Sequence, residues 1–227
     1  MQHFLSLLQF ADGLFPAGVY AHSFGLEECV QSDEVRDAAG VEAFLHAFLR
    51  GSAGPTDTVV VLYARRAAAA GDLEAIVSLD ATLDAMKAAS ELREASRQMG
   101  RQMLRVAANL QHAPLIDQFA RAVGEAITPG HHAVVFGAIG GALNWDSLDM
   151  TGAYLYSTSA ALVGAALRLL PLGQLAGQRI LWNAQPLIAE LAQEAQDTTE
   201  EDIWSFAPAL EIASMRHALL DARLFRS

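Results

Sequence analysis

Cysteine is almost absent from this sequence, since Cys29 is the only one among 227 residues. A single thiol excludes an intramolecular disulfide and any zinc cluster built from several cysteines. The first ten residues contain neither lysine nor arginine, so we expect no signal peptide. A reducing, cytoplasmic setting fits both observations.

Basic residues and long apolar runs are also scarce. Fifteen lysines and arginines stand against 26 aspartates and glutamates, which gives a formal net charge of −11. Nucleic-acid surfaces need clustered lysine and arginine, so this balance argues against a nucleic-acid partner. The longest apolar run, Ser159 to Leu167, ends at Arg168 and is too short to cross a bilayer, so we expect no membrane span.

Motifs for nucleotide or acyl chemistry are missing as well. The sequence has no P-loop spacing, no G-x-G-x-x-G after a strand and no G-x-S-x-G elbow. His131 with His132, and His22 with Cys29 two helical turns later, offer at most two metal ligands each, whereas a metal site needs three or four. We therefore predict no catalytic residue, no metal site and no cofactor. Capping or core histidines and a buried thiol are expected, and a transient Ni²⁺ contact is the open alternative.

Apolar helical sequence is what the chain has in abundance. Hydrophobic residues make up 52% and charged residues 18%, apolar positions recur at helical spacing, and strict strand alternation persists nowhere. We predict an all-α fold, a single domain over residues 1–227 that forms a bundle of about ten helices. So apolar a chain is also expected to hide surface against a partner.

Glycine and proline set the expected ends of the helices. A helix over residues 41–50 should stop at Gly51–Pro55, and Thr56 or Asp57 should cap the next one. A helix that begins at Pro114 should end near Thr128.

Four further stretches have less determined structures. Residues 83–110 form one helix or two. Residues 131–143 could be a strand, but their glycine spacing favours a helix that another backbone approaches closely. Residues 193–202 and the tail 221–227 are polar or terminal, so we expect both to be exposed.

One segment, Asp12 to Glu28, departs from the helical pattern. It holds three glycines, a proline and three aromatic residues. Ser23 can cap a short helix over residues 26–30, with Glu27 and Glu28 near its positive end. A plain linker between two helices is the alternative interpretation. We call Asp12 to Glu28 the signature segment.

Other patterns leave alternatives open. Arginines at positions 93, 97, 101 and 105 form either a solvated face paired with carboxylates such as Glu94 and Asp117, or a docking face for an acidic partner. Two rival functions are a helical carrier that binds an apolar ligand and a metal-dependent enzyme. The sequence features behind them are Met86, Met99 and Met103 for the carrier and His131 and His132 for the enzyme.

Five separated motifs resemble the UreF family of urease accessory proteins. Asp12–Glu27 matches the family pattern Asp-Ser-x-Phe/Leu-Pro-x-Gly-x-Phe/Tyr-x-His-Ser-x-Gly-Leu-Glu, except that Gly13 stands where serine is usual. The other matches follow in order over nearly the whole length. They are Ser96–Leu104, His132–Gly137, Arg168–Leu181 and Pro208–Ser227, in which Ala218 stands where an acidic residue is common.

The resemblance implies an all-helical protein that is not an enzyme and helps to load nickel into urease. The implied partners are UreD (also called UreH), the GTPase UreG and the urease apoprotein. The resemblance also implies that a UreF protein regulates GTP hydrolysis by UreG. Homodimerisation and a nickel tunnel through the accessory complex are implied as well.

The matching motifs also supply candidate partner-binding residues. The exposed tail, with an aromatic anchor, is expected to dock to UreD. Glu27 and Arg168 are candidates for UreG contact or regulation, and a core-edge ion pair is the alternative for Arg168. The full set is Tyr20, His22, Glu27, Arg168, Gln174, Arg223, Leu224, Phe225 and Ser227.

Overall fold

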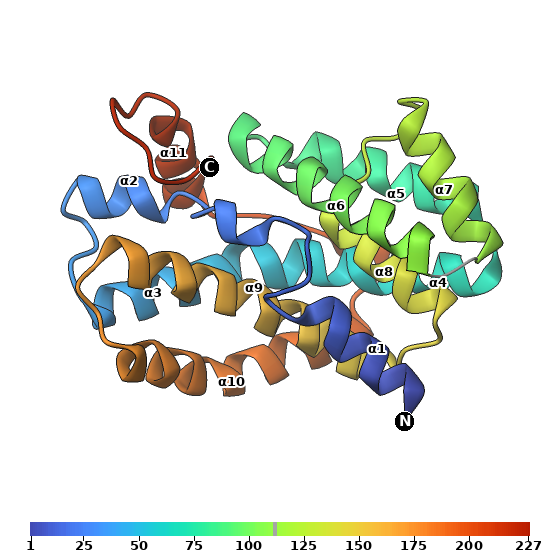
Figure 1. Ribbon diagram of the computed structural model, residues 1–227, viewed down its shortest axis with the longest axis horizontal. Helices are drawn as coiled ribbons and strands as arrows, with labels where there is room; N and C mark the ends of the chain where they lie inside the picture. The colour runs from blue at the N-terminus through green and yellow to red at the C-terminus, as the bar shows by residue number, and fades with distance from the viewer. Residues whose placement is uncertain (111–112) are drawn as a thin grey trace.

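Helices dominate the computed structural model, which describes residues 1–110 and 113–227 (Figure 1). No strand occurs in these residues, so the predicted all-α fold is confirmed. Nor does any helix among them combine the length and hydropathy that crossing a bilayer requires. The helices are α1 Gln2–Ala11, η1 Val19–Ala21, α2 Leu26–Gln31, α3 Ala38–Phe48, η2 Leu49–Thr58, α4 Val59–Ala70, α5 Leu73–Met86, α6 Ser90–Leu110, α7 Pro114–Gly124, α8 His132–Ala142, α9 Ser147–Leu169, α10 Gln174–Asp197, η3 Glu200–Asp202 and α11 Pro208–His217.

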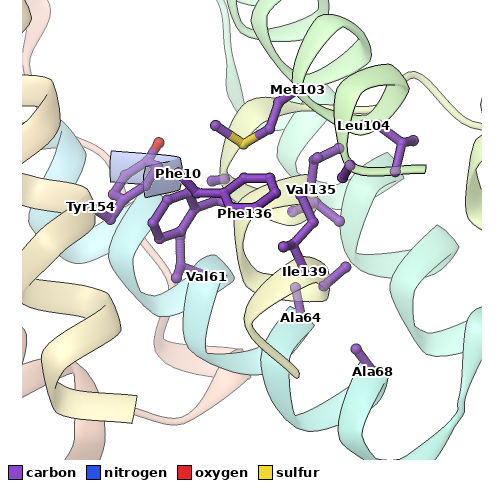
Figure 2. Packing of buried hydrophobic residues seen from close by; sticks show 14 of the residues in the cluster. Phe10, Val61, Ala64, Ala68, Met103, Leu104, Val135, Phe136, Ile139 and Tyr154 are labelled. Carbon is purple, nitrogen blue, oxygen red and sulfur yellow. The ribbon is translucent and has the colours of Figure 1, made fainter. Parts of the chain in front are cut away.

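Helices α4 and α8 pack closely against each other because α8 presents glycines to the α4 backbone. A Cβ atom at Gly137 would collide with the carbonyl oxygen of Val61, and one at Gly141 would collide with that of Arg65. The helix predicted over residues 131–143 is confirmed, and so is the close backbone approach that its glycines indicate. Around this contact, Phe136 and Tyr154 gather beside Val61 (Figure 2).

Two clusters of buried apolar side chains form the core. One lies among α1, α4, α5, α7 and α8, and the other among α2, α3, α10 and α11. Two long helices contribute to both clusters. Helix α6 supplies Met103 to the first and Met99 to the second, and α9 supplies Tyr154 and Leu155 in the same way. The two clusters are therefore joined through continuous helices.

The predicted break at Gly51–Pro55 is wrong, because a π-helix (η2) connects α3 to α4 there. Its wider turn accommodates Pro55, which lacks an N–H donor. Gly51 packs against Phe206, whose N–H donates to the Gly51 carbonyl (2.8 Å). Thr56 and Asp57 therefore lie inside a helix and do not cap one. Long-range contacts determine this region more than local propensity does.

The ends of four other helices either differ from the predicted ends or decide between two predicted possibilities. The stretch 83–110 is two helices, α5 and α6, separated at residues 87–89. Helix α7 ends at Gly124, before the expected end near Thr128. Helix α10 continues to Asp197 because Ala195 is buried, so the exposed loop predicted from residue 193 is wrong over its first part.

Candidate functional site: the junction of the signature segment and the C-terminal tail

The signature segment lies against the tail, residues 221–227, although they come from opposite ends of the sequence. Helices α2 and α11 are in contact, and the C-terminal end lies beside them (Figure 1). We call this region, together with Arg168 of α9, the junction. It contains most of the residues that the sequence singles out as partner-binding.

Glycines shape the signature segment where its chain reverses. Gly18 (φ 81°) and Gly25 (φ 86°) adopt the left-handed conformation that L side chains rarely adopt. At Gly25 a side chain would also press on the backbone nitrogen of Ser214 in α11. These positions let α2 begin at Leu26, as predicted, directly against α11.

Between these glycines, the chain pairs with the tail through its backbone. The Arg226 N–H donates to the Ala21 carbonyl (2.9 Å), and the Ser23 N–H donates to the Ser227 carbonyl (2.6 Å). The Ser23 hydroxyl donates to the same Ser227 oxygen (2.8 Å) and accepts only a long bond from the Glu27 N–H (3.4 Å). The N-cap of α2 is Gly25, so the predicted capping role of Ser23 is wrong, and the Ser23 hydroxyl instead contacts the tail.

Glu27 is the acceptor at the centre of the junction. Its carboxylate, 1% exposed, accepts bonds from the Leu224 N–H (2.6 Å) and the Phe225 N–H (3.0 Å), and lies 2.9 Å from His217 Nε2. Burial alone would raise the pKa of Glu27, but the bonds from Leu224, His217 and Phe225 outweigh it and lower that pKa. Glu27 is therefore an internal anion that fastens the tail, and does not act as a solvated helix-start charge.

A second carboxylate extends this network to α6. His217 Nδ1 lies 2.7 Å from Glu91, and the guanidinium of Arg223 donates to the other Glu91 oxygen (2.8 Å). Sequence reasoning missed Glu91, because no local pattern links it to a tail more than a hundred residues away. Only the helical packing brings the two together.

Arg168 connects α9 to both parts of the junction. Its Nη1 donates to the Tyr20 carbonyl (3.0 Å), and its guanidinium carbon lies 4.3 Å from the centre of the Phe225 ring. Such a cation–π contact orients the guanidinium without neutralising it. Among the described residues no carboxylate comes within 4.0 Å of Arg168, so the core-edge ion pair is not found.

Most of the tail is exposed, as predicted, but two of its residues are buried. Phe225 is 4% exposed and Ser227 is 1% exposed, and His22 Nδ1 lies 2.8 Å from the Ser227 hydroxyl. The expected exposure is therefore wrong for both residues, because contacts with the signature segment bury them. Leu224 remains 53% exposed and Tyr20 is 72% exposed.

Gln174 lies outside the junction. It is the first residue of α10, is exposed, and makes no side-chain hydrogen bond with a described residue. The structure therefore joins eight of the nine candidate residues and leaves Gln174 apart.

A surface hollow of about 560 Å³ opens at the junction, and we call it the arginine hollow. Two guanidiniums, two amides and apolar groups line it, and none of its lining residues is an aspartate or glutamate. The lining residues are Pro16, Ala17, Gly18, Tyr20, Ala21, His22, Gln98, Gln102, Arg168, Leu224 and Arg226.

A second hollow, of about 410 Å³, adjoins it at Ala17, Tyr20 and Arg168. Aromatic and small side chains from α1, α8 and α9 dominate its walls, and Met103 also lines it. Met86 and Met99 lie elsewhere. The three methionines that suggested an apolar ligand thus do not share one pocket.

The histidine and cysteine pairs do not converge on a metal. His131 Nε2 faces Asp84 (2.8 Å), whereas the His132 ring packs 5.4 Å from that of Tyr154. Burial, followed by the nearby charges of Glu28 and Glu34, raises the pKa of Cys29 to about 12, which disfavours the metal-binding thiolate. The described residues contain no group of three or more histidine, cysteine or carboxylate ligands.

The four arginines of α6 serve mostly as internal contacts. Arg97 bonds to Asp84 (2.6 Å) and to Glu94 (3.1 Å), as the carboxylate-paired interpretation predicts for Glu94. Arg101 donates to the Pro129 carbonyl (2.9 Å). The other two contact neighbouring acceptors, Arg93 the Lys87 carbonyl and Arg105 the Gln102 amide.

Comparisons with known proteins agree with the motif pattern. The family model described as UreF matches residues 35–185. The chain is 34% identical to the urease accessory protein UreF of Bacillus sp. (strain TB-90), with all of both chains covered. It is 33% identical to that of Nostoc sp. (strain PCC 7120 / SAG 25.82 / UTEX 2576), with 99% of this chain and 96% of the relative covered.

Proposed function

Because the chain belongs to the UreF family of urease accessory proteins, and is thus a maturation factor and not an enzyme, we propose that it acts as an adaptor in nickel insertion. It binds UreD (UreH), and through that complex recruits UreG to the urease apoprotein and regulates its GTP hydrolysis. It works in the cytoplasm, as one domain and as a homodimer. The chain supplies no resident metal or cofactor of its own.

One observation carries this proposal: a junction held by hydrogen bonds presents apolar side chains to solvent. The side chains of Tyr20 and Leu224 stay exposed, although their backbones are fixed by Arg168 and Glu27. An anchored aromatic or aliphatic side chain loses little conformational entropy when a protein covers it. The junction is therefore suited to bind a partner without first being ordered.

The candidate residues divide into two roles under this proposal. Tyr20, Leu224 and Arg168 contact the partner directly. A second set holds them in place from inside the chain, namely His22, Glu27, Arg223, Phe225 and Ser227. Gln174 contributes a separate contact at the start of α10.

Exposed apolar residues on another helix support the homodimer. On α10, Trp182 is 71% exposed and Leu175 lies exposed two helical turns before it. A large solvent-facing tryptophan commonly marks a protein interface. We assign this face of α10 to the second copy of the chain.

The test is a quantitative pull-down of UreD and UreG with substituted chains. Tyr20→Ser and Leu224→Ser should each weaken capture at least about tenfold, as loss of an interface anchor does. Ile127→Ser is the matched control, because Ile127 is exposed and lies outside the junction. Equal capture by all three variants would refute the assignment of the junction as the partner surface.

A further inference from the structure

The polar lining of the arginine hollow is rich in hydrogen-bond donors, and His22 and Tyr20 line it as well. Arg168 and Arg226 supply guanidinium groups, and Gln98 and Gln102 supply amides. The Gln102 carbonyl oxygen already accepts from Arg105, which leaves its amide N–H groups available. Because no carboxylate lines the hollow, its chemistry favours a ligand that brings acceptors.

The charge of the hollow runs against that of the whole chain. The formal net charge is −11, yet neither Arg168 nor Arg226 has a carboxylate within 4.0 Å among the described residues. Two guanidiniums that share one hollow repel each other unless an anion lies between them. An anion bound in the hollow would therefore be attracted by two guanidiniums that no side-chain carboxylate neutralises.

Both arginines are positioned to bind a carboxylate. Arg168 is held by the Tyr20 carbonyl and the Phe225 ring. Arg226 is fixed only through its backbone N–H, which donates to the Ala21 carbonyl (2.9 Å), while its side chain makes no hydrogen bond with a described residue. One guanidinium is preorganised and the other is free to close on a ligand.

We propose that the arginine hollow binds an aspartate or glutamate side chain of the protein partner that docks at the junction. The proposal rests on the proposed function and names the chemistry that the partner must bring. A volume of about 560 Å³ exceeds what a single free carboxylate fills, and Pro16, Ala17 and Leu224 add apolar wall. A carboxylate carried on a peptide segment uses both the donors and the apolar wall, whereas a free inorganic anion uses only the donors.

The test compares two variants that each remove one positive charge. Arg226→Gln keeps the tail backbone intact, and Arg121→Gln is the control, because Arg121 is exposed on α7 and does not line the hollow. Binding of full-length chains to UreD and to UreG is measured at low and high salt. Arg226→Gln should weaken at least one partner about tenfold or more and reduce the salt dependence of that affinity. The control should change neither.

A second variant and a small-anion arm keep the outcome decisive. Arg168→Gln should weaken the same partner as Arg226→Gln, and melting temperature establishes whether the chain remains folded. If the wild-type chain binds but Arg226→Gln binds equally well, the inference is overturned and the proposed function stands. If the wild-type chain binds neither partner, the proposed function fails first.

A separate measurement tests inorganic phosphate binding to the isolated chain. If phosphate binds at micromolar concentration and Arg226→Gln removes that binding without changing partner affinity, the hollow is a free-anion site and the inference is overturned.

Discussion

The carboxylate of Glu27 and the imidazole of His217 lie 2.9 Å apart, although 190 residues separate them in sequence. The same carboxylate binds two consecutive backbone N–H groups of the tail. One buried anion thus holds the last helix and the tail against the signature segment. The consequences for stability and binding can be measured.

Replacing Glu27 with glutamine should release the tail. The amide keeps the size of the side chain but loses the charge that strengthens all three bonds, so we expect a loss of about 1–3 kcal/mol in local stability. Hydrogen exchange at the amides of Leu224 and Phe225 should accelerate accordingly. Glu125→Gln, at an exposed position after α7, is the control, and equal protection in both variants would contradict the role of Glu27.

Acid should destabilise the fold between pH 6.5 and about 4. Burial lowers the pKa of His22 from 6.5 to about 4, and the charge of Arg226 adds to this shift. Burial likewise lowers the pKa of His132 from 6.5 to about 4. In this window the unfolded chain binds more protons, so the free energy of unfolding falls as pH falls, by at most about 1.4 kcal/mol per pH unit for each histidine. Urea unfolding of His132→Leu should show a shallower pH slope than wild type. His3→Gln should not, because His3 is exposed on α1.

Alanine at Gly137 should destabilise the protein severely. The added methyl group would collide with the Val61 carbonyl, and the α4–α8 contact must open to admit it. We expect a loss near the upper end of the about 1–3 kcal/mol that overpacking a core typically costs, because the collision is with backbone and not with a flexible side chain. Gly152→Ala is the control, because its Cβ would meet no atom within 4 Å and alanine should add about 0.5–1 kcal/mol to the stability of a helix interior. If denaturant unfolding showed that both variants are less stable than wild type, or that both are more stable, the packing argument would be contradicted.

Serine at Trp182 should shift the chain from dimer to monomer. The indole is exposed on α10, and its loss removes the largest apolar group of the proposed interface. Light scattering coupled to size-exclusion chromatography should show at least a tenfold weaker dimer. Phe206→Ser removes another exposed aromatic group away from α10. Its mass should stay that of the wild type, and a wild-type monomer would rule out the homodimer.

Local patterns were enough to predict much of the fold. Helix α7 begins at Pro114 and α2 begins at Leu26, both as predicted. Each start depends on residues beside it in sequence, so a short window contains the signal. The glycine spacing of α8 also indicated its close helix contact correctly.

Contacts between distant residues account for what the sequence could not predict. Gly51 and Pro55 normally end a helix, but packing against Phe206 favours continuation through η2. A terminal tail is normally solvated, yet Glu27 and Arg168 bury Phe225. The motifs singled out residues that the fold brings together, but their proposed division into inner supports and outer contacts depends on packing that no local pattern contains.

The dependence of the signature segment on the tail also affects how the protein is made. Ser23 and Glu27 form long-range hydrogen bonds with residues 217–227, so a nascent chain on the ribosome cannot complete the junction until these residues have emerged. Truncated chains that end before residue 217 would lack the junction altogether.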